Sequence, residues 1–253
     1  MEEIVIISKK NLSDFKGENG IYCLKIKPHK KEEALHRLAE WLHETYGEEI
    51  LFQKISAYTG GMSSQEVNNV KRLALQEFSR EKEGFVRFIM DSLTDLAEVS
   101  NFINLDGFTF FGMQEYRKEA EYLLEDCIEA YLSRESYREF LDLLHYFVEL
   151  EESRLSQLYV VANTDGSYRF YDESYQEITM KCEQMFLDEF PEIDEEAEKE
   201  NDMLISILVI LVPEKIILYG IKNVKNKNFL ITLQNIFQKR ICFLEEVPQF
   251  FMQ

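Results

Sequence analysis

The chain begins with two short apolar runs and then changes to apolar positions at helical spacing. The runs IVIIS and GIYCLKIK are rich in β-branched side chains and flank a polar, glycine-bearing segment, which predicts two paired strands joined by a loop. After Pro28, apolar residues from Leu35 to Tyr46 recur at helical spacing, and Gly47 is a typical helix end. Residues 1–60 therefore predict a small N-terminal αβ unit.

The next region, 61–153, carries apolar positions at helical spacing almost throughout. The stripe over 64–99 predicts helix, and Gly84 leaves open whether it is one bent helix or two. A further stripe begins at Met113, and the polar SRES is expected to end it, with Ser136 capping another helix. We expect an all-helical middle region.

Between these helical patterns lies the aromatic-rich stretch NFINLDGFTFFGMQEY, residues 101–116. The pair Asp106 and Gly107 predicts a chain turn. The apolar side chains around it are too numerous for an exposed loop, so we expect them to anchor the turn in the helical core. These side chains are Phe102, Ile103, Leu105, Phe108, Phe110 and Phe111.

The last region, 154–253, alternates between strand-like and helix-like patterns. Two apolar runs flank NTDGS, where Asp165 and Gly166 predict a β-hairpin. The runs KIILYG, NFLITLQNIFQKR and ICFLEEV predict a strand, a helix and a strand whose crossover makes the strands parallel. Residues 203–212 fit a helix or a buried strand. The helix is favoured because the preceding acids suit a helix N-terminus and no turn residue separates them from this run. A mixed α+β fold with an α/β C-terminal region follows.

The charge balance limits the possible partners. Lys and Arg number 28 against 47 Asp and Glu, and the net charge of -19 disfavours nucleic acid and anionic lipid. Residues 188–202 form an acidic block, which predicts a disordered linker or, as we favour, a helix start capped by Asp194. The longest apolar run ends before Pro213 after ten residues, about half of the roughly 20 that cross a bilayer. We expect no membrane span.

The cysteines and the N-terminus indicate a cytoplasmic location. The sequence MEEIVIISKK lacks the basic region and apolar length of a signal peptide. The cysteines are far apart and include no C-x-x-C pair, so we expect reduced thiols and neither a zinc ribbon nor a disulfide framework. They are Cys23, Cys127, Cys182 and Cys242.

The clearest candidate for chemistry is a set of three polar residues on the expected first helix. His36, Glu40 and His43 fall within roughly 60° of one another on one helix face and could bind a metal. We favour the interpretation that they line the polar rim of that helix, because no fourth ligand is visible. His145 lies among core-type residues and is expected to be packed or hydrogen-bonded. Without a catalytic or nucleotide motif, we expect neither an enzyme nor a cofactor.

Several blocks carry a resemblance to a known family. GFTFFGMQEY is similar to the pattern Gly-Phe-x-x-Phe-Arg-Leu-x-x-Tyr of the YtxC-like sporulation proteins of endospore-forming bacteria, and SYREFLDLLHYFVELEE and DMLISILVILVPEKIILYG resemble further blocks. The resemblance covers about residues 100–245. Gly112 and His145 depart from it, standing where the pattern has arginines. The resemblance implies a link to sporulation and carries over no catalytic residue.

These observations favour a cytoplasmic, non-enzymatic protein that acts through protein contacts. An alternative is a small-molecule-binding protein or enzyme with a site beyond the carboxyl ends of the strands Lys215–Tyr219 and Ile241–Glu245. A third is mimicry of nucleic acid by the acidic segment 188–202. The oligomeric state and the identity of the partner stay open.

Overall fold

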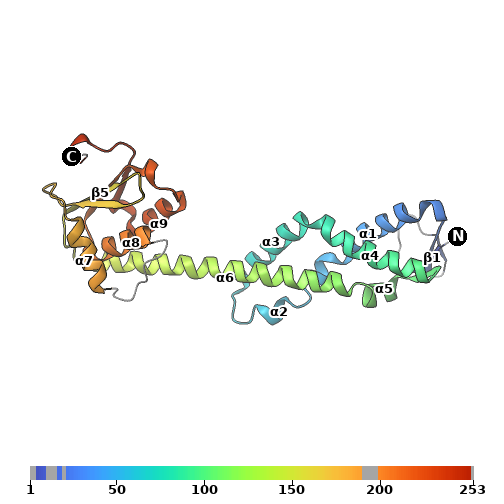
Figure 1. Ribbon diagram of the computed structural model, residues 1–253. Coiled ribbons are helices and arrows are strands. Elements are labelled where there is room, and N and C mark those ends of the chain that lie inside the picture. The colour runs from blue at the N-terminus through green and yellow to red at the C-terminus, as the bar shows by residue number, and fades with distance from the viewer. Residues whose placement is uncertain (1–3, 10–15, 19–20, 190–198, 252–253) are drawn as a thin grey trace. The chain divides into compact units, whose positions relative to one another are not determined.

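The protein has the expected mixed α+β fold. A computed structural model describes residues 4–9, 16–18, 21–189 and 199–251 (Figure 1). The chain divides into two compact units, Met1–Arg134 and Glu135–Gln253, called unit 1 and unit 2 below. Unit 1 thus combines the expected N-terminal unit with most of the expected helical region, and the three-part division stays a prediction.

Unit 1 consists of a small sheet and a group of helices. Its elements are β1 (Ile4–Ser8), β2 (Lys16–Glu18), β3 (Ile21–Ile26), η1 (Pro28–Lys30), α1 (Lys31–Leu51), α2 (Ile55–Tyr58), α3 (Ser64–Arg80), α4 (Lys82–Val99), β4 (Phe102–Asn104), α5 (Leu105–Phe111) and the first part of α6 (Gln114–Leu150).

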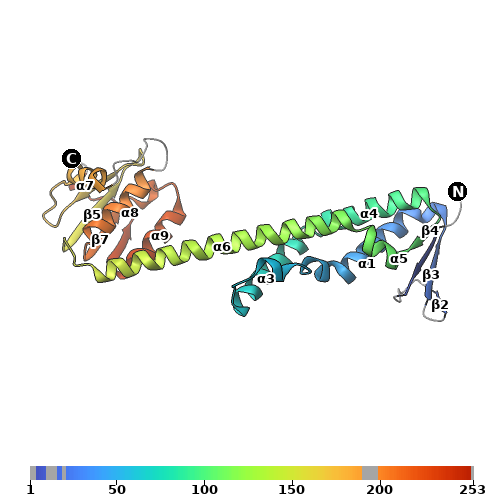
Figure 2. The ribbon, with the colours of Figure 1, turned by 90° about the horizontal axis from the view of Figure 1, so that it is seen from below.

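The sheet of unit 1 has the strand order β2-β3-β1-β4. β1 and β3 pair antiparallel, which confirms the expected pairing of the two N-terminal strands, and β4 joins the other edge of β1 in parallel. Figure 2 shows this sheet at one end of α1 and α4. Ile4, Ile6 and Ile103 bury their side chains in the same core as the helices.

The helix α1 continues through Gly47 to Leu51, so the expected end at Gly47 is wrong. The glycine allows close packing instead. A Cβ atom at this position would lie 2.8 Å from the hydroxyl oxygen of Tyr116 and 3.0 Å from the ring of Phe78. At Gly47 the backbone of α1 therefore lies too close to side chains of α3 and α6 to leave room for a Cβ atom.

Residues 64–99 form two helices, and the break lies at Glu81, not at Gly84. Glu81 ends α3, its backbone N–H donating to the carbonyl oxygen of Glu77. The rings of Phe78 and Phe85 lie on either side of the break with centroids 4.5 Å apart, so both helices contribute to one core. At the other end of α3, Ser63 and Glu66 form a capping box.

The expected turn at Asp106 and Gly107 is wrong, because these residues lie in α5. The side chain of Asn104 caps this helix by accepting a hydrogen bond of 3.2 Å from the backbone N–H of Gly107. The aromatic stretch divides between core and surface. Ile103, Leu105 and Phe108 are buried as expected, but the anchoring role was wrong for three other side chains, which are 52%, 74% and 79% exposed: Phe102, Phe110 and Phe111.

The expected break at SRES is also wrong, since α6 is a single helix from Gln114 to Leu150. SRES contains neither glycine nor proline, and serine lowers helix propensity only slightly. Glu135 of this stretch forms an ion pair of 2.6 Å with Arg138, one turn further along the helix. Ser136 therefore lies inside the helix and does not cap one.

Unit 2 contains the rest of α6 and an α/β arrangement. Its elements are β5 (Gln157–Ala162), β6 (Tyr168–Tyr171), α7 (Thr179–Glu189), α8 (Lys199–Leu211), β7 (Lys215–Tyr219), η2 (Ile221–Asn223), α9 (Lys227–Phe237), η3 (Gln238–Arg240), β8 (Ile241–Leu244) and η4 (Gln249–Phe251).

The second sheet has the strand order β6-β5-β7-β8. β5 and β6 form the expected antiparallel hairpin, and β7 and β8 are parallel across α9, which confirms the expected crossover. One face packs against α6, α7, α8 and α9 in a core that includes Phe170, Leu204 and Leu233 (Figure 2). The other face carries Tyr159 and Tyr171, which contact Phe251 of the C-terminal η4.

Residues 203–211 lie in α8, so the helical interpretation of this apolar run is correct. The proposed cap Asp194 and most of the acidic block lie outside the described residues. The sequence pattern had not indicated α7, whose buried residues Cys182 and Phe186 belong to the core of unit 2.

Candidate functional site

The three candidate metal ligands do not come together. His36 and Glu40 lie on the surface with a nitrogen to oxygen distance of 3.7 Å, whereas His43 is buried with 7% of its surface exposed. Within the described part of the chain, no group of three His, Cys, Asp or Glu side chains is arranged to hold a metal ion. The polar-rim interpretation fits His36 and Glu40, and His43 is a core residue.

His43 belongs to an aromatic cluster inside unit 1. Its Nδ1 lies 2.9 Å from the hydroxyl oxygen of Tyr116, and its ring stacks on Phe78 with centroids 4.8 Å apart. Burial lowers the pKa of His43, and the positive charge of Lys82 lowers it further. Burial raises the pKa of Tyr116. Both groups are therefore neutral, and their hydrogen bond joins α1 to α6.

The lowered pKa of His43 predicts that unit 1 loses stability in mild acid. The unfolded chain takes up the proton near pH 6.5 while the folded chain resists it, so the contribution is present above that pH and is lost as pH falls below it. The free energy of unfolding should fall by up to about 1.4 kcal/mol per pH unit from this group. Urea denaturation of wild type and His43→Gln across this range measures it, and equal slopes would contradict the prediction.

His145 is half-buried and hydrogen-bonded, as expected. Its Nδ1 donates a hydrogen bond of 2.8 Å to the carbonyl oxygen of Ile236, which ties α6 to α9 in unit 2. With its N–H satisfied in this way, His145 has a structural role.

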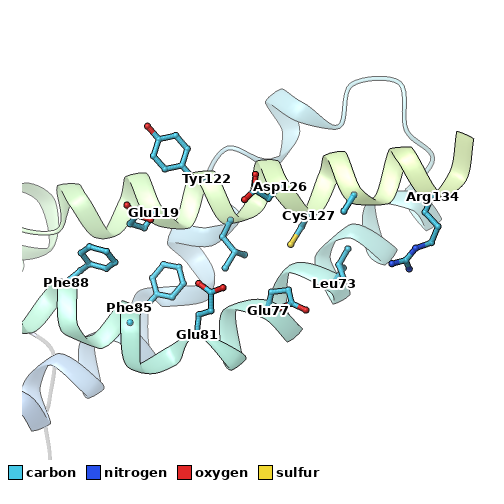
Figure 3. Close-up of a pocket in the computed structure, with 13 residues that line it drawn as sticks. Leu73, Glu77, Glu81, Phe85, Phe88, Glu119, Tyr122, Asp126, Cys127 and Arg134 are labelled. Carbon is cyan, nitrogen blue, oxygen red and sulfur yellow. The ribbon is translucent and has the colours of Figure 1, made fainter. Parts of the chain in front are cut away.

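Unit 1 has a groove between α3, α4 and α6, called the acidic groove below. Its volume is about 500 Å³. Figure 3 shows Leu73, Phe85 and Cys127 pointing into the space between the helices, whereas Tyr122 points out of it. Phe88 is 36% exposed at one side, so part of the apolar lining faces solvent.

Four carboxylates line the acidic groove: Glu77, Glu81, Glu119 and Asp126. One of them, Glu77, forms an ion pair of 2.6 Å with Arg80. Among the described residues that line the groove, Arg134 is the one with a basic side chain. The groove thus combines an apolar floor with net negative charge, an arrangement that attracts cationic groups.

Cys127 in the groove is a poor nucleophile. It is buried, and burial raises the pKa of its thiol, as do the neighbouring charges of Glu77, Asp126 and Glu81. Because the thiolate is the reactive form, this thiol stays protonated and unreactive at neutral pH. The groove therefore suits binding better than covalent chemistry.

The sequence did not indicate this groove. Its residues come from three helices and the break at Glu81, and the first and last of them, Leu73 and Arg134, are 61 positions apart. Acids are abundant along the whole chain. Helical spacing shows which face of a helix is polar but not which faces meet. One feature of the sequence does bear on the groove. On α4 and α6, apolar and acidic residues occur together on a face of the helix that would ordinarily be wholly polar.

The residues that follow β7 are bonded to the end of β5 and to the residue after β8. Asn223 donates a hydrogen bond of 2.8 Å to the carbonyl oxygen of Ala162, and Lys222 pairs with Glu245 at 2.7 Å. Gly220 adopts a positive φ of 72° where the chain leaves β7. A ligand site at this edge stays a prediction.

The fold and the groove define a mixed α+β protein whose helical unit carries an acidic, partly apolar concave surface. By sequence, the chain belongs to the YtxC-like family, whose sequence profile matches residues 32–242. The match extends further toward the N-terminus than the blocks that first indicated the family. No helix among the described residues has the length and apolar character needed to cross a membrane.

A curated relative is the uncharacterized protein YtxC of Bacillus subtilis (strain 168). It is 23% identical over 161 residues, which cover 62% of this chain and 53% of the relative. This chain therefore spans about half the length of that relative. No solved structure matches.

Proposed function

We propose that this protein is cytoplasmic and acts by binding another protein, without catalysis, and that the acidic groove takes a basic amphipathic helix of that partner. The observation that carries the proposal is the combination of an apolar floor with carboxylates from α3, from α6 and from Glu81 at the break between α3 and α4. Apolar side chains of the partner would contact Phe88, which is 36% exposed, and its lysines or arginines would face the acids.

The charge of the whole chain supports a basic partner. A net charge of -19 speeds the approach of a cationic protein and repels an anionic one. The side chain of Phe88 supplies a large apolar contact beside the acids. Because the resemblance implies a link to sporulation, basic proteins made during sporulation are the first partners to test.

A synthetic helical peptide of leucine and lysine, with leucines at i, i+3, i+4 and i+7, is the probe for this proposal. We expect wild type to bind it and the double variant Glu81→Lys with Asp126→Lys to bind it at least about tenfold more weakly, because two attractive contacts become repulsive. Phe88→Ala should also weaken binding, which purely electrostatic attraction would not explain. Isothermal titration calorimetry measures all three affinities.

The matched control is Glu151→Lys with Glu152→Lys, which changes the net charge equally at exposed positions of unit 2. This control should bind the peptide nearly as wild type does. Equal weakening by both charge variants would mean that the peptide responds only to net charge. That result, or an unchanged affinity in the groove variant, would refute the proposed binding site.

A further inference from the structure

A second surface, separate from the acidic groove, lies on the part of α6 in unit 2. Five large apolar side chains follow one another along one side of this helix with 43% to 66% of their surfaces exposed. They are Phe140, Leu143, Tyr146, Phe147 and Leu150, called the α6 stripe below.

The opposite side of the same helix segment is fixed in unit 2. Leu141 and Val148 are buried in its core, 6% and 0% exposed. The hydroxyl of Tyr137 lies 2.7 Å from that of Thr232, and His145 bonds to the carbonyl oxygen of Ile236. The helix therefore cannot rotate to bury the stripe without losing these contacts.

The spacing of the α6 stripe is that of a helix that pairs with another helix. Phe140, Leu143, Phe147 and Leu150 are three, four and three residues apart, the a and d spacing of a heptad. When an identical helix lies antiparallel, Phe140 faces Leu150 of the other copy and Leu143 faces its Phe147. Every layer of the helix pair then contains one phenylalanine and one leucine. In a parallel pair, phenylalanine would face phenylalanine.

We propose that the α6 stripe binds the α6 stripe of a second copy of this chain, antiparallel, in a two-fold symmetric dimer. The stripe fits itself because the order phenylalanine, leucine, phenylalanine, leucine gives identical mixed layers when one copy is reversed. In this arrangement the two Tyr146 side chains lie close to the two-fold axis and cover one side of the seam.

The exposed area agrees with a dimer of moderate affinity. A large aromatic side chain carries about 150–250 Å², so the stripe presents on the order of 500 Å² per copy. This value is at the upper end of what monomeric proteins leave exposed in one patch. Together with the polar side chains beside it, the seam approaches the roughly 800 Å² per partner of stable interfaces. A dissociation constant in the micromolar range is expected.

The charge of the chain gives this dimer a characteristic salt dependence. Two copies with a net charge of -19 each repel one another, and added salt screens that repulsion. The dimer should therefore tighten as salt increases. Binding of a basic peptide to the acidic groove should weaken under the same conditions, so the two interactions can be distinguished and either can fail alone.

Sedimentation velocity of the full chain at micromolar concentrations, in low and high salt, tests the dimer. We expect a dimer for wild type and at least a tenfold weaker association for Leu143→Glu, since a carboxylate would be buried in the seam. Val99→Glu, at an exposed apolar position 82% exposed in unit 1, is the matched control and should leave the dimer intact. Circular dichroism should show all three to be folded.

A monomeric wild type would overturn the proposal, and so would a dimer that Leu143→Glu does not weaken. The antiparallel arrangement has its own test in a mixture of Leu143→Glu with Phe147→Lys. Each variant alone should be monomeric. In the mixture, the glutamate introduced at position 143 of one copy faces the lysine introduced at position 147 of the other, and Phe147 of the first copy still faces Leu143 of the second. A heterodimer should therefore form. Absence of that heterodimer would refute the antiparallel arrangement.

Discussion

Replacing Phe170 by alanine is expected to lower the free energy of unfolding of unit 2 by about 3–5 kcal/mol. Phe170 lies in β6, is 0% exposed and packs in the core that joins the second sheet to its helices. The truncation leaves a cavity that the surrounding side chains can fill only in part. Urea denaturation followed by circular dichroism measures the loss.

The matched control is Phe111→Ala, which makes the same change at a side chain that is 79% exposed. Its effect should stay within about 0.5 kcal/mol. Tryptophan fluorescence adds a second control, because the single tryptophan, Trp41, lies in α1 and reports on unit 1. Equal losses of stability in the two phenylalanine variants would contradict the assignment of Phe170 to the core.

The same substitution at two helical glycines should have opposite effects. Alanine at Gly47 is expected to destabilise unit 1 by about 1–3 kcal/mol through overpacking, because its Cβ would lie 2.8 Å from the hydroxyl oxygen of Tyr116. That hydroxyl is held by His43 and cannot move aside without losing a hydrogen bond. Thermal denaturation of Gly47→Ala measures the effect.

Alanine at Gly84 is the comparison, since no atom lies within 4 Å of the position its Cβ would take. There the gain in helix propensity should stabilise α4 by about 0.5–1 kcal/mol. If Gly47→Ala also raised the melting temperature, the tight approach of α1 to Tyr116 would be refuted.

The strands and the hairpin could be predicted because their signals are local. Gly166 has a positive φ of 99°, and the backbone N–H of Ser167 donates to the carboxylate of Asp165 at 2.9 Å. Both features follow from the Asp-Gly pair itself. The parallel pairing of β7 with β8 likewise follows from the strand, helix and strand in succession.

The helix ends were harder to predict because tertiary contacts override weak local signals. SRES resembles a break, yet α6 continues through it because Tyr131 and Leu141 are buried on either side and hold both segments helical. Gly47 resembles a stop, yet packing against Tyr116 explains its presence. The exposure of Phe110 and Phe111 could not be predicted, since an apolar pattern does not show which apolar residues find a partner.

The candidate surfaces were missed for a related reason. The acidic groove requires knowing that α3 and α4 lie beside α6, which no periodicity reveals. The heptad spacing of Phe140 to Leu150 is visible in the sequence, but apolar stripes at helical spacing usually form part of a core, so the pattern alone does not indicate an exposed side. The structure shows that Leu141 and Val148 are the residues that α6 buries in unit 2, so the stripe from Phe140 to Leu150 is a second apolar side that faces solvent.

The position of β1 inside its sheet has a consequence for synthesis on the ribosome. β1 needs β4 as its second neighbour, and the backbone N–H of Lys9 bonds to the carboxylate of Asp106, 97 residues further along the chain. At about 5–20 residues per second, translation leaves that edge unpaired for on the order of 5 to 20 seconds. The emerging segment IVIIS is β-branched and apolar, so the nascent chain should depend on chaperones during this interval.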